Sequence, residues 1–312
     1  MNDLAEQAHA LLAEQTQSWP TLKKNRAMLD HMEIRAFDFG KFVVKTQWNP
    51  ERLYSVSAKV DDESIRNRKC FLCDENRPAE QHSLDCGNGY KLLCNPFPIL
   101  PEHFTLVSNR HEPQRIGNSF ATMLELTELL GSRYTVFYNG PQCGASAPDH
   151  LHFQAGNIGA TPVDQEYDRI KKSFARRDEV EIFVGEDYLR PFLSIESRNR
   201  EAVERAFAQI HDEFGQFAPN PIEPKMNVFC SRSGETFRAI VFPRTHHRPS
   251  AYYAADPAAR LLLSPGAADM SGIVVMPIEE QFRRITQNDL ALMYEQTCVS
   301  PETVLRLAQF FT

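Results

Sequence analysis

The sequence lacks an excess of basic residues, a long apolar run and a secretion signal. Its net charge is −7 at pH 7, so it does not have the basic surface that nucleic-acid binding requires. No stretch approaches the roughly 20 apolar residues that cross a bilayer. The first residues, MNDLAE, form neither a basic n-region nor an apolar h-region. We therefore expect a protein that binds neither nucleic acid nor membrane.

Disulfide bonds are not expected either. The chain has seven cysteines in 312 residues, and an odd number in a chain of this length argues against a secreted disulfide framework. Hydrophobic residues make up 42% and charged residues 24% of the sequence, which are ordinary globular values. These features predict a cytoplasmic protein with reduced thiols and one large or two moderate cores.

Two similar series of elements follow one another along the chain, after a predicted helix at 3–16 and a predicted strand at 41–48. The first series has predicted strands at 90–95, 104–108, 134–139 and 150–155, with a helix at 119–130. The second has a predicted helix at 201–214, strands at 226–230, 237–242 and 272–276, and a last helix that begins at residue 301. The run 237–247 echoes 104–111, which suggests a duplication.

This order predicts an α+β fold of two related halves, each with a mostly antiparallel sheet and packed helices. Residues 157–178 are polar and lack apolar periodicity, so we place a boundary or long loop there. The chain is thus divided into a catalytic half, 1–165, and a degenerate second half, 166–312, which is expected to complete the site.

The motif HLHFQ at residues 150–154 is the most informative segment. Side chains alternate along a strand, so His150, His152 and Gln154 are expected on one face, with the two apolar residues anchored in a core on the other. A neutral imidazole is a good nucleophile toward phosphorus, provided that an acceptor holds the proton on its other nitrogen. Three polar residues on the wet face of an edge strand are the alternative.

A CxxC motif, Cys70 and Cys73, precedes this segment. Alone, the pair is compatible with a redox dithiol, half of a zinc site or two buried thiols. The redox interpretation requires a βαβ context, which the sequence does not indicate. Zinc requires two further ligands, for which His111 and His150 are candidates on adjacent strands.

Residues 139–154 resemble the active-site segment of the histidine-triad (HIT) superfamily, in its HxHxQ nucleotidyltransferase branch. That branch includes galactose-1-phosphate uridylyltransferase, diadenosine tetraphosphate phosphorylase and GDP-L-galactose phosphorylase. The stretches GASAP at 144–148 and NPFPILPEHFTLV at 95–107 are similar to the phosphorylases. Leu151 replaces the proline of the uridylyltransferases, and the tetraphosphate phosphorylases generally lack the zinc cysteines. The resemblance therefore does not identify a single substrate for this protein.

The resemblance implies roles for individual residues. His152 would be the nucleophile that becomes nucleotidylated, and Gln154 would hold the α-phosphate oxygens. Phosphate or ribose contacts are implied for Asn95, Asn139, Gly144 and Ser146. A structural zinc ion is implied on Cys70, Cys73, His111 and His150.

Two further cations, Arg52 and Lys59, precede the CxxC motif and are candidates for phosphate binding, with surface salt bridges as the alternative for each. The pair His246 and His247 is interpreted as surface or loop residues, because no cysteine or acidic cluster adjoins it.

The predicted function is a nucleotidyltransferase or phosphorylase. Its donor would be a nucleoside diphosphate-sugar or a dinucleoside polyphosphate, and its acceptor inorganic phosphate or a sugar phosphate. The alternatives are a nucleotide hydrolase of the same superfamily and a catalytically silent nucleotide-binding protein. A monomer and a homodimer are both compatible with the resemblance.

Overall fold

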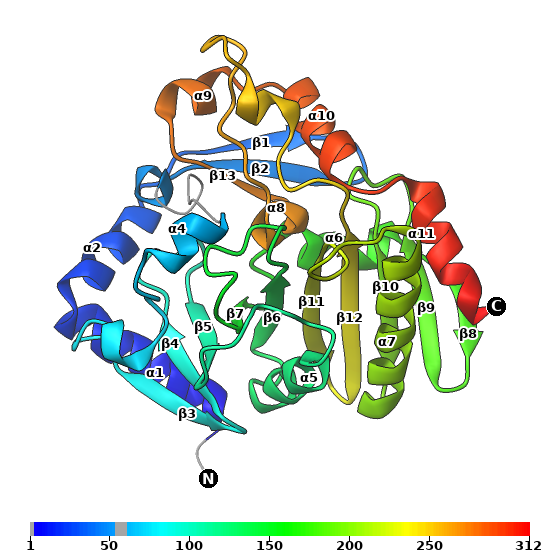
Figure 1. The fold of residues 1–312 in the computed structure, drawn as a ribbon, viewed down its shortest axis with the longest axis horizontal. Coiled ribbons are helices and arrows are strands. Elements are labelled where there is room, and N and C mark those ends of the chain that lie inside the picture. Colours follow the sequence, from blue (N-terminus) through cyan, green and yellow to red (C-terminus); the bar gives the residue numbers. More distant parts are fainter. Residues whose placement is uncertain (1–2, 54–60) are drawn as a thin grey trace.

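The computed structural model describes residues 3–53 and 61–312, which form a ten-stranded sheet, a three-stranded sheet and the helices that cover them (Figure 1). The strands of the large sheet are β3 (Ser83–Gly87), β4 (Tyr90–Cys94), β5 (His103–Ser108), β6 (Tyr134–Asn139), β7 (His152–Asn157), β8 (Lys171–Arg177), β9 (Val180–Gly185), β10 (Leu193–Ser197), β11 (Met226–Ser233) and β12 (Thr236–Pro243). The small sheet contains β1 (Ile34–Asp38), β2 (Val43–Trp48) and β13 (Ile273–Met276). No helix among the described residues is long and apolar enough to cross a membrane.

The large sheet contains two halves with mirrored strand order. Its order is β3-β4-β5-β7-β6-β11-β12-β10-β9-β8, and every pair of neighbours is antiparallel. Helix α5 (Phe120–Leu129) connects β5 to β6, and α7 (Arg200–Phe217) connects β10 to β11 at the corresponding place. The predicted fold class is confirmed. In this order β12 corresponds to β7. The similarity between 237–247 and 104–111 suggested instead that β12 corresponds to β5.

Helices cover one face of the large sheet. They are α1 (Leu4–Ser18), α5, α7 and α11 (Pro301–Ala308), which contact β3, β6, β10 and β9 respectively. The buried side chains between them include Leu151 and Phe153, which are 3% and 0% exposed. The apolar residues of the HLHFQ motif therefore anchor this segment in a core, as the sequence predicted.

The small sheet packs over part of the opposite face, together with α6 (Pro162–Ile170), α8 (Ala267–Ser271), α9 (Glu279–Arg284) and α10 (Gln287–Thr297). Strand β13 pairs in parallel with β2, so a C-terminal strand joins an N-terminal one outside the main sheet. Two other helices, α2 (Pro20–Leu29) and α4 (Asp62–Arg66), lie on the N-terminal side. The rest of that face is left for the site.

The expectation of a long loop at 157–178 is wrong, because α6 and β8 occupy most of this range, although the change from the first half of the sheet to the second does lie within it. Thr161 caps α6, Pro162 is its first residue, and the buried Val163, Tyr167 and Ile170 give it one apolar side. Edge strand β8 follows directly and has the polar sequence KKSFARR, because an edge strand with one solvated face needs few apolar residues. Residue 165 falls within α6, and the β6–β11 pairing makes the two halves one sheet.

Candidate active site and metal centre

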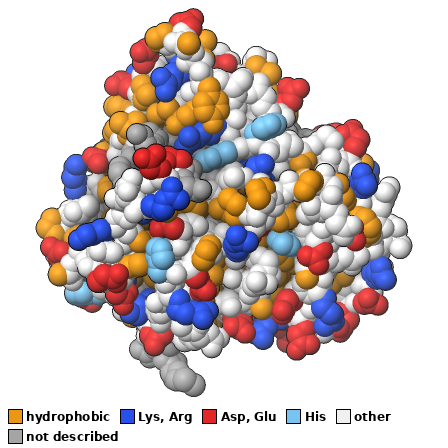
Figure 2. Space-filling view, in the orientation of Figure 1, with side chains coloured by type: hydrophobic (Ala, Val, Ile, Leu, Met, Phe, Trp, Pro, Cys, Tyr) orange, Lys and Arg blue, Asp and Glu red, His pale blue; other side chains and the backbone are white. Residues whose placement is uncertain are grey.

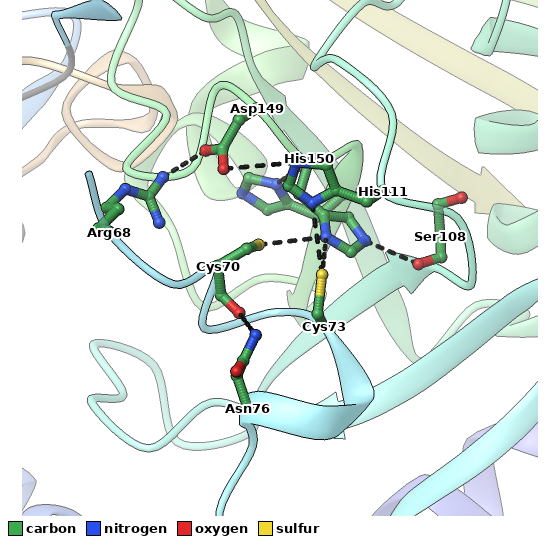
Figure 3. A network of polar contacts seen from close by, with 9 residues as sticks. Arg68, Cys70, Cys73, Asn76, Ser108, His111, Asp149 and His150 are labelled. Atoms are coloured by element: carbon green, nitrogen blue, oxygen red, sulfur yellow. Dashed lines mark hydrogen bonds and ion pairs between the residues drawn. The ribbon is translucent and has the colours of Figure 1, made fainter. Parts of the chain in front are cut away.

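Cys70, Cys73, His111 and His150 lie together, with their ligand atoms all within 4.8 Å of one another (Figure 3). The cysteines lie on the turn before a short 3-10 helix, Asp74–Asn76, while His111 follows β5 and His150 precedes β7. Cys70 Sγ is 3.3 Å from His150 Nδ1, and Cys73 Sγ is 3.3 Å from His111 Nδ1. Two thiols and two imidazoles at these separations fit a tetrahedral zinc ion.

The other nitrogen of each imidazole is oriented by a neighbour. His150 Nε2 lies 2.8 Å from the carbonyl oxygen of Ser108, so Nε2–H donates and Nδ1 is left to face the sulfurs. His111 Nε2 lies 3.8 Å from Asp149, which pairs with Arg68 (Figure 3). Contacts of this kind fix the tautomer of metal-binding histidines, which is a second reason that the four residues fit a metal.

His152 is the first residue of β7, two residues later than the predicted start of the strand. Its Nδ1 is 2.7 Å from the carbonyl oxygen of His150, so Nδ1–H donates there and Nε2 keeps a free lone pair. Burial lowers the pKa of His152 to about 4, and the ring is therefore neutral and nucleophilic near neutral pH. The sequence predicted this arrangement of the two nitrogens.

Gln114 holds the backbone on which His152 lies, and no local sequence pattern indicated this role. Its side chain is fully buried between the ends of β6 and β7. The amide oxygen accepts from His152 N at 2.8 Å, while the amide nitrogen donates to the carbonyl oxygens of His152 and Asn139, both at 2.9 Å. Gln114 therefore fixes the start of β7 relative to the end of β6.

Gln154 is oriented by a buried histidine. Ile99 N donates to His103 Nδ1 at 3.2 Å, so His103 Nε2 carries the proton and donates to Gln154 Oε1 at 2.8 Å. Burial, and secondarily the charge of Arg52, lower the pKa of His103 to about 3, so this ring remains neutral. Because its oxygen is occupied, Gln154 presents the NH2 group, which is a hydrogen-bond donor.

His152 and Gln154 line a cavity of about 350 Å³. Other residues that the sequence predicted for phosphate or ribose binding also line it: Arg52, Asn95, Asn139, Gly144 and Ser146. Lys59 lies outside the described residues. Predicted phosphate-binding residues from both sides of the CxxC motif thus line one cavity. The four candidate metal ligands are not among the residues that line it.

Two of these residues also hold loops from the two halves together. Asn139 Oδ1 accepts from Ala267 N at 2.6 Å and from Asn227 Nδ2 at 3.1 Å, which leaves its own NH2 for a ligand. Gly144 has φ +97°, and a Cβ there would lie 2.5 Å from the Cα of Gly266. Glycine at 144 is therefore required by the close approach of the second-half loop.

The second half contributes its own residues to the cavity, among them His247, Arg248, Ser264 and Asp269. His246 is exposed, as predicted, whereas His247 is half-buried and its Nε2 is 3.3 Å from Ser264 Oγ. Burial raises the pKa of Asp269 to about 7 and lowers that of Arg52 to about 10, while their opposite charges act against these shifts. Only the sheet topology brings these residues to His152, so local sequence patterns could not identify them.

The chain is similar to known proteins in sequence and in fold. Residues 11–157, which end with β7, match a family model described as a domain of unknown function (DUF4922). Two curated proteins of Saccharomyces cerevisiae are similar over short stretches. Protein APA1 is 37% identical over 73 residues, or 21% of this chain and 23% of that protein. Diadenosine 5',5'''-P1,P4-tetraphosphate phosphorylase 2 is 39% identical over 82 residues, or 22% and 25%. The matched stretches thus span about a quarter of each relative.

Among solved structures, yeast Ap4A phosphorylase Apa2 in complex with Ap4A is similar over 96% of this chain and 98% of that one, with a TM-score of 0.59 and 19% identity. The chain has the fold of that phosphorylase. The predicted α+β architecture is confirmed.

Proposed function

We propose that this protein is a nucleotidyltransferase of the phosphorylase type that forms a covalent nucleotidyl-His152 intermediate. The main support is the arrangement of His152 and Gln154 on one cavity wall. His150 O holds the Nδ1 proton and leaves Nε2 available, while His103 holds Gln154 with its amide donors directed away from His103. A nucleoside diphosphate-sugar or a dinucleoside polyphosphate is the donor.

The proposed first step is an in-line displacement. The Nε2 lone pair of His152 attacks the α-phosphorus as the bond from that phosphorus to the bridging oxygen breaks. The leaving group takes the electron pair and departs as a phosphate or nucleotide anion. In the second step an oxygen of inorganic phosphate or a sugar phosphate attacks the same phosphorus, the P–N bond breaks and neutral His152 is regenerated.

Gln154 favours leaving groups that need no proton. Its NH2 stabilises negative charge on the non-bridging oxygens, but an amide cannot serve as a general acid. A leaving phosphate is stable as an anion, so the lack of an acid does not hinder its departure. This chemistry supports group transfer between phosphates.

We assign supporting roles to the second half and to the metal cluster, by which we mean the four residues Cys70, Cys73, His111 and His150. The loop that carries Ser264 and Gly266 lines the cavity together with His247 and with residues of β7, so we assign residues 166–312 the role of completing the site of the catalytic half. A zinc ion on Cys70, Cys73, His111 and His150 would have a structural role, because all four of its positions would be filled by protein. It would fix the residue whose carbonyl orients His152.

Trapping the adduct tests the proposed function. The protein is incubated with Ap4A or with ADP-, GDP- and UDP-sugars that are labelled in the α-phosphate, and is then denatured and assayed for acid-labile label on histidine. We expect label on the wild-type protein and on His246→Ala, an exposed-histidine control, but not on His152→Ala. Retained label on His152→Ala would refute the mechanism. Turnover without phosphate as fast as with it would identify a hydrolase instead.

A further inference from the structure

A second cavity, of about 550 Å³, lies between α2 and the small sheet. Residues of α1, α2, β1, β2 and β13 contribute to its lining, together with the stretch 99–101 that precedes β5. Of this lining, one residue, the buried Ile99, also lines the cavity that contains His152. The volume is in the range of sites that hold small ligands, which is about 300–1,000 Å³. The second cavity is therefore a separate candidate site.

Three cationic side chains and one carboxylate line this cavity. Lys23 and Arg26 are three residues apart on α2 and so share one face of the helix, while Lys45 lies on β2 and Asp30 follows α2. None of these four side chains forms an ion pair within the part of the chain that the structure describes. Arg26 donates to the carbonyl oxygen of Pro101, which leaves its charge in place. Three cations against one carboxylate leave a formal charge of +2, which suits a dianion.

Gln47 adds a polar group that lacks a partner. It lies two residues after Lys45 on β2, so both side chains are on the same face of the strand. Gln47 is only 6% exposed, and its Oε1 is buried without a hydrogen-bond partner among the described residues. Buried amides in proteins nearly always have a partner. Since the two ends of an amide have nearly the same shape, Gln47 can turn either its oxygen or its NH2 toward a ligand.

The rest of the wall is mainly apolar. It includes Leu29, Ile34, Leu100 and Ile273. Ile34 is 56% exposed, which is unusual for a large aliphatic side chain on a strand. Inorganic phosphate would match the charge of the cavity but leave this apolar surface uncovered. A phosphate that carries an apolar substituent would cover it as well.

The cavity is suited to binding and not to the proposed chemistry. The described residues that line it include no histidine and no cysteine. Their one hydroxyl, that of Thr16, already donates to the carbonyl oxygen of Leu12 at 2.6 Å. A molecule bound here is therefore held without reacting.

We infer that this cavity is a second binding site, for a phosphate monoester with a compact apolar group. Lys23, Arg26 and Lys45 hold the dianionic phosphate, and Gln47 donates its NH2 to a phosphate oxygen. The aliphatic side chains of the opposite wall cover the apolar group. This site lies outside the proposed function and does not depend on it.

Calorimetry on the full chain tests this inference with three probes: phenyl phosphate, inorganic phosphate and benzoate. At about pH 8 the phosphate of the first is a dianion. We expect phenyl phosphate to bind about tenfold more tightly than either of the others, because only it combines two charges with an apolar group. Lys45→Met and Lys23→Met should each weaken its binding about tenfold, and Gln47→Met about fivefold. Lys172→Met, on edge strand β8, is the matched control and should bind like the wild-type protein.

A crystal soaked with p-bromophenyl phosphate locates the ligand directly. Anomalous scattering should place a bromine atom between α2 and the small sheet. Bromine found only in the cavity of His152, or binding that is lost in Arg52→Met and kept in Lys45→Met, would overturn the inference. Benzoate that binds as tightly as phenyl phosphate would overturn it too, as would unchanged binding in both lysine variants. Lys23 is exposed on its helix, so Lys23→Met decides the matter even where a variant on β2 fails to fold.

Discussion

His152 Nδ1 donates a hydrogen bond to the backbone carbonyl oxygen of His150, 2.7 Å away, while Nδ1 of the His150 ring lies 3.3 Å from Cys70 Sγ. One residue thus links the metal cluster to the nucleophile. A change in the cluster that displaces the His150 backbone would also displace the acceptor that sets the tautomer of His152. The metal cluster can therefore affect the chemistry without touching a substrate.

Removal of the zinc ion that we propose on Cys70, Cys73, His111 and His150 should destabilise the protein and slow adduct formation. A ligand present at about 1,000 times its Kd stabilises the folded state by about 4 kcal/mol. We therefore expect a chelator to lower the thermal midpoint of the wild-type protein by several degrees. Cys73→Ser should unfold at the lower temperature with or without chelator. Elemental analysis should find about one zinc per wild-type chain; a full complement of zinc in Cys73→Ser would contradict the assignment.

Gln154→Glu should reduce transfer strongly although the two side chains have nearly the same shape. The substitution replaces the NH2 donor by a carboxylate oxygen, which repels the α-phosphate. Loss of one such donor costs about 10²–10³-fold in kcat. Single-turnover adduct formation measures this directly, and Gln165→Glu, on the exposed side of α6, provides the matched control. An unchanged rate in Gln154→Glu would rule out the donor role.

Acid should destabilise the folded state through His103. Its pKa is about 3 when folded, against an ordinary value of 6.5, so between these values the unfolded chain binds a proton that the folded chain does not. The free energy of unfolding therefore falls as the pH falls through this window. From pH 6.5 to pH 4 this residue should account for a loss of about 3 kcal/mol. Urea unfolding of the wild-type protein and of His103→Gln should show a shallower pH dependence in the variant.

Two glycines with positive φ provide a matched pair for the contact between the halves. Gly144 and Gly159 have φ +97° and +77°, but a Cβ at Gly159 meets nothing within 4 Å. Gly159→Ala should therefore lose about 1 kcal/mol from backbone strain alone. Gly144→Ala should lose about 3 kcal/mol, because the loop of Gly266 must also move. Equal losses by denaturant titration would show that the contact is unimportant.

The grouping of Cys70 and Cys73 with two histidines, and the place of His152 on the cavity wall, could be predicted because each has a local signal. Cys70 and Cys73 have the spacing of zinc ligands, and the alternation around Phe153 places His152 and Gln154 on the face opposite the core. The role of His103 had no such signal, since it depends on Ile99 N and on pairing between β5 and β7. His247 and Asp269 could not be found either, because they reach His152 only through the β6–β11 pairing and the loops that follow it.

The mirrored strand order has a consequence for the two halves as separate pieces. Either half alone would leave its inner strand, β6 or β11, as an open sheet edge with unpaired amides and carbonyls. The strand best suited to fill such an edge is the inner strand of another half, approached antiparallel. The chain therefore joins covalently, in one molecule, what two shorter chains could build as a two-fold dimer. Two fragments cut between β7 and α6 would be expected to find each other.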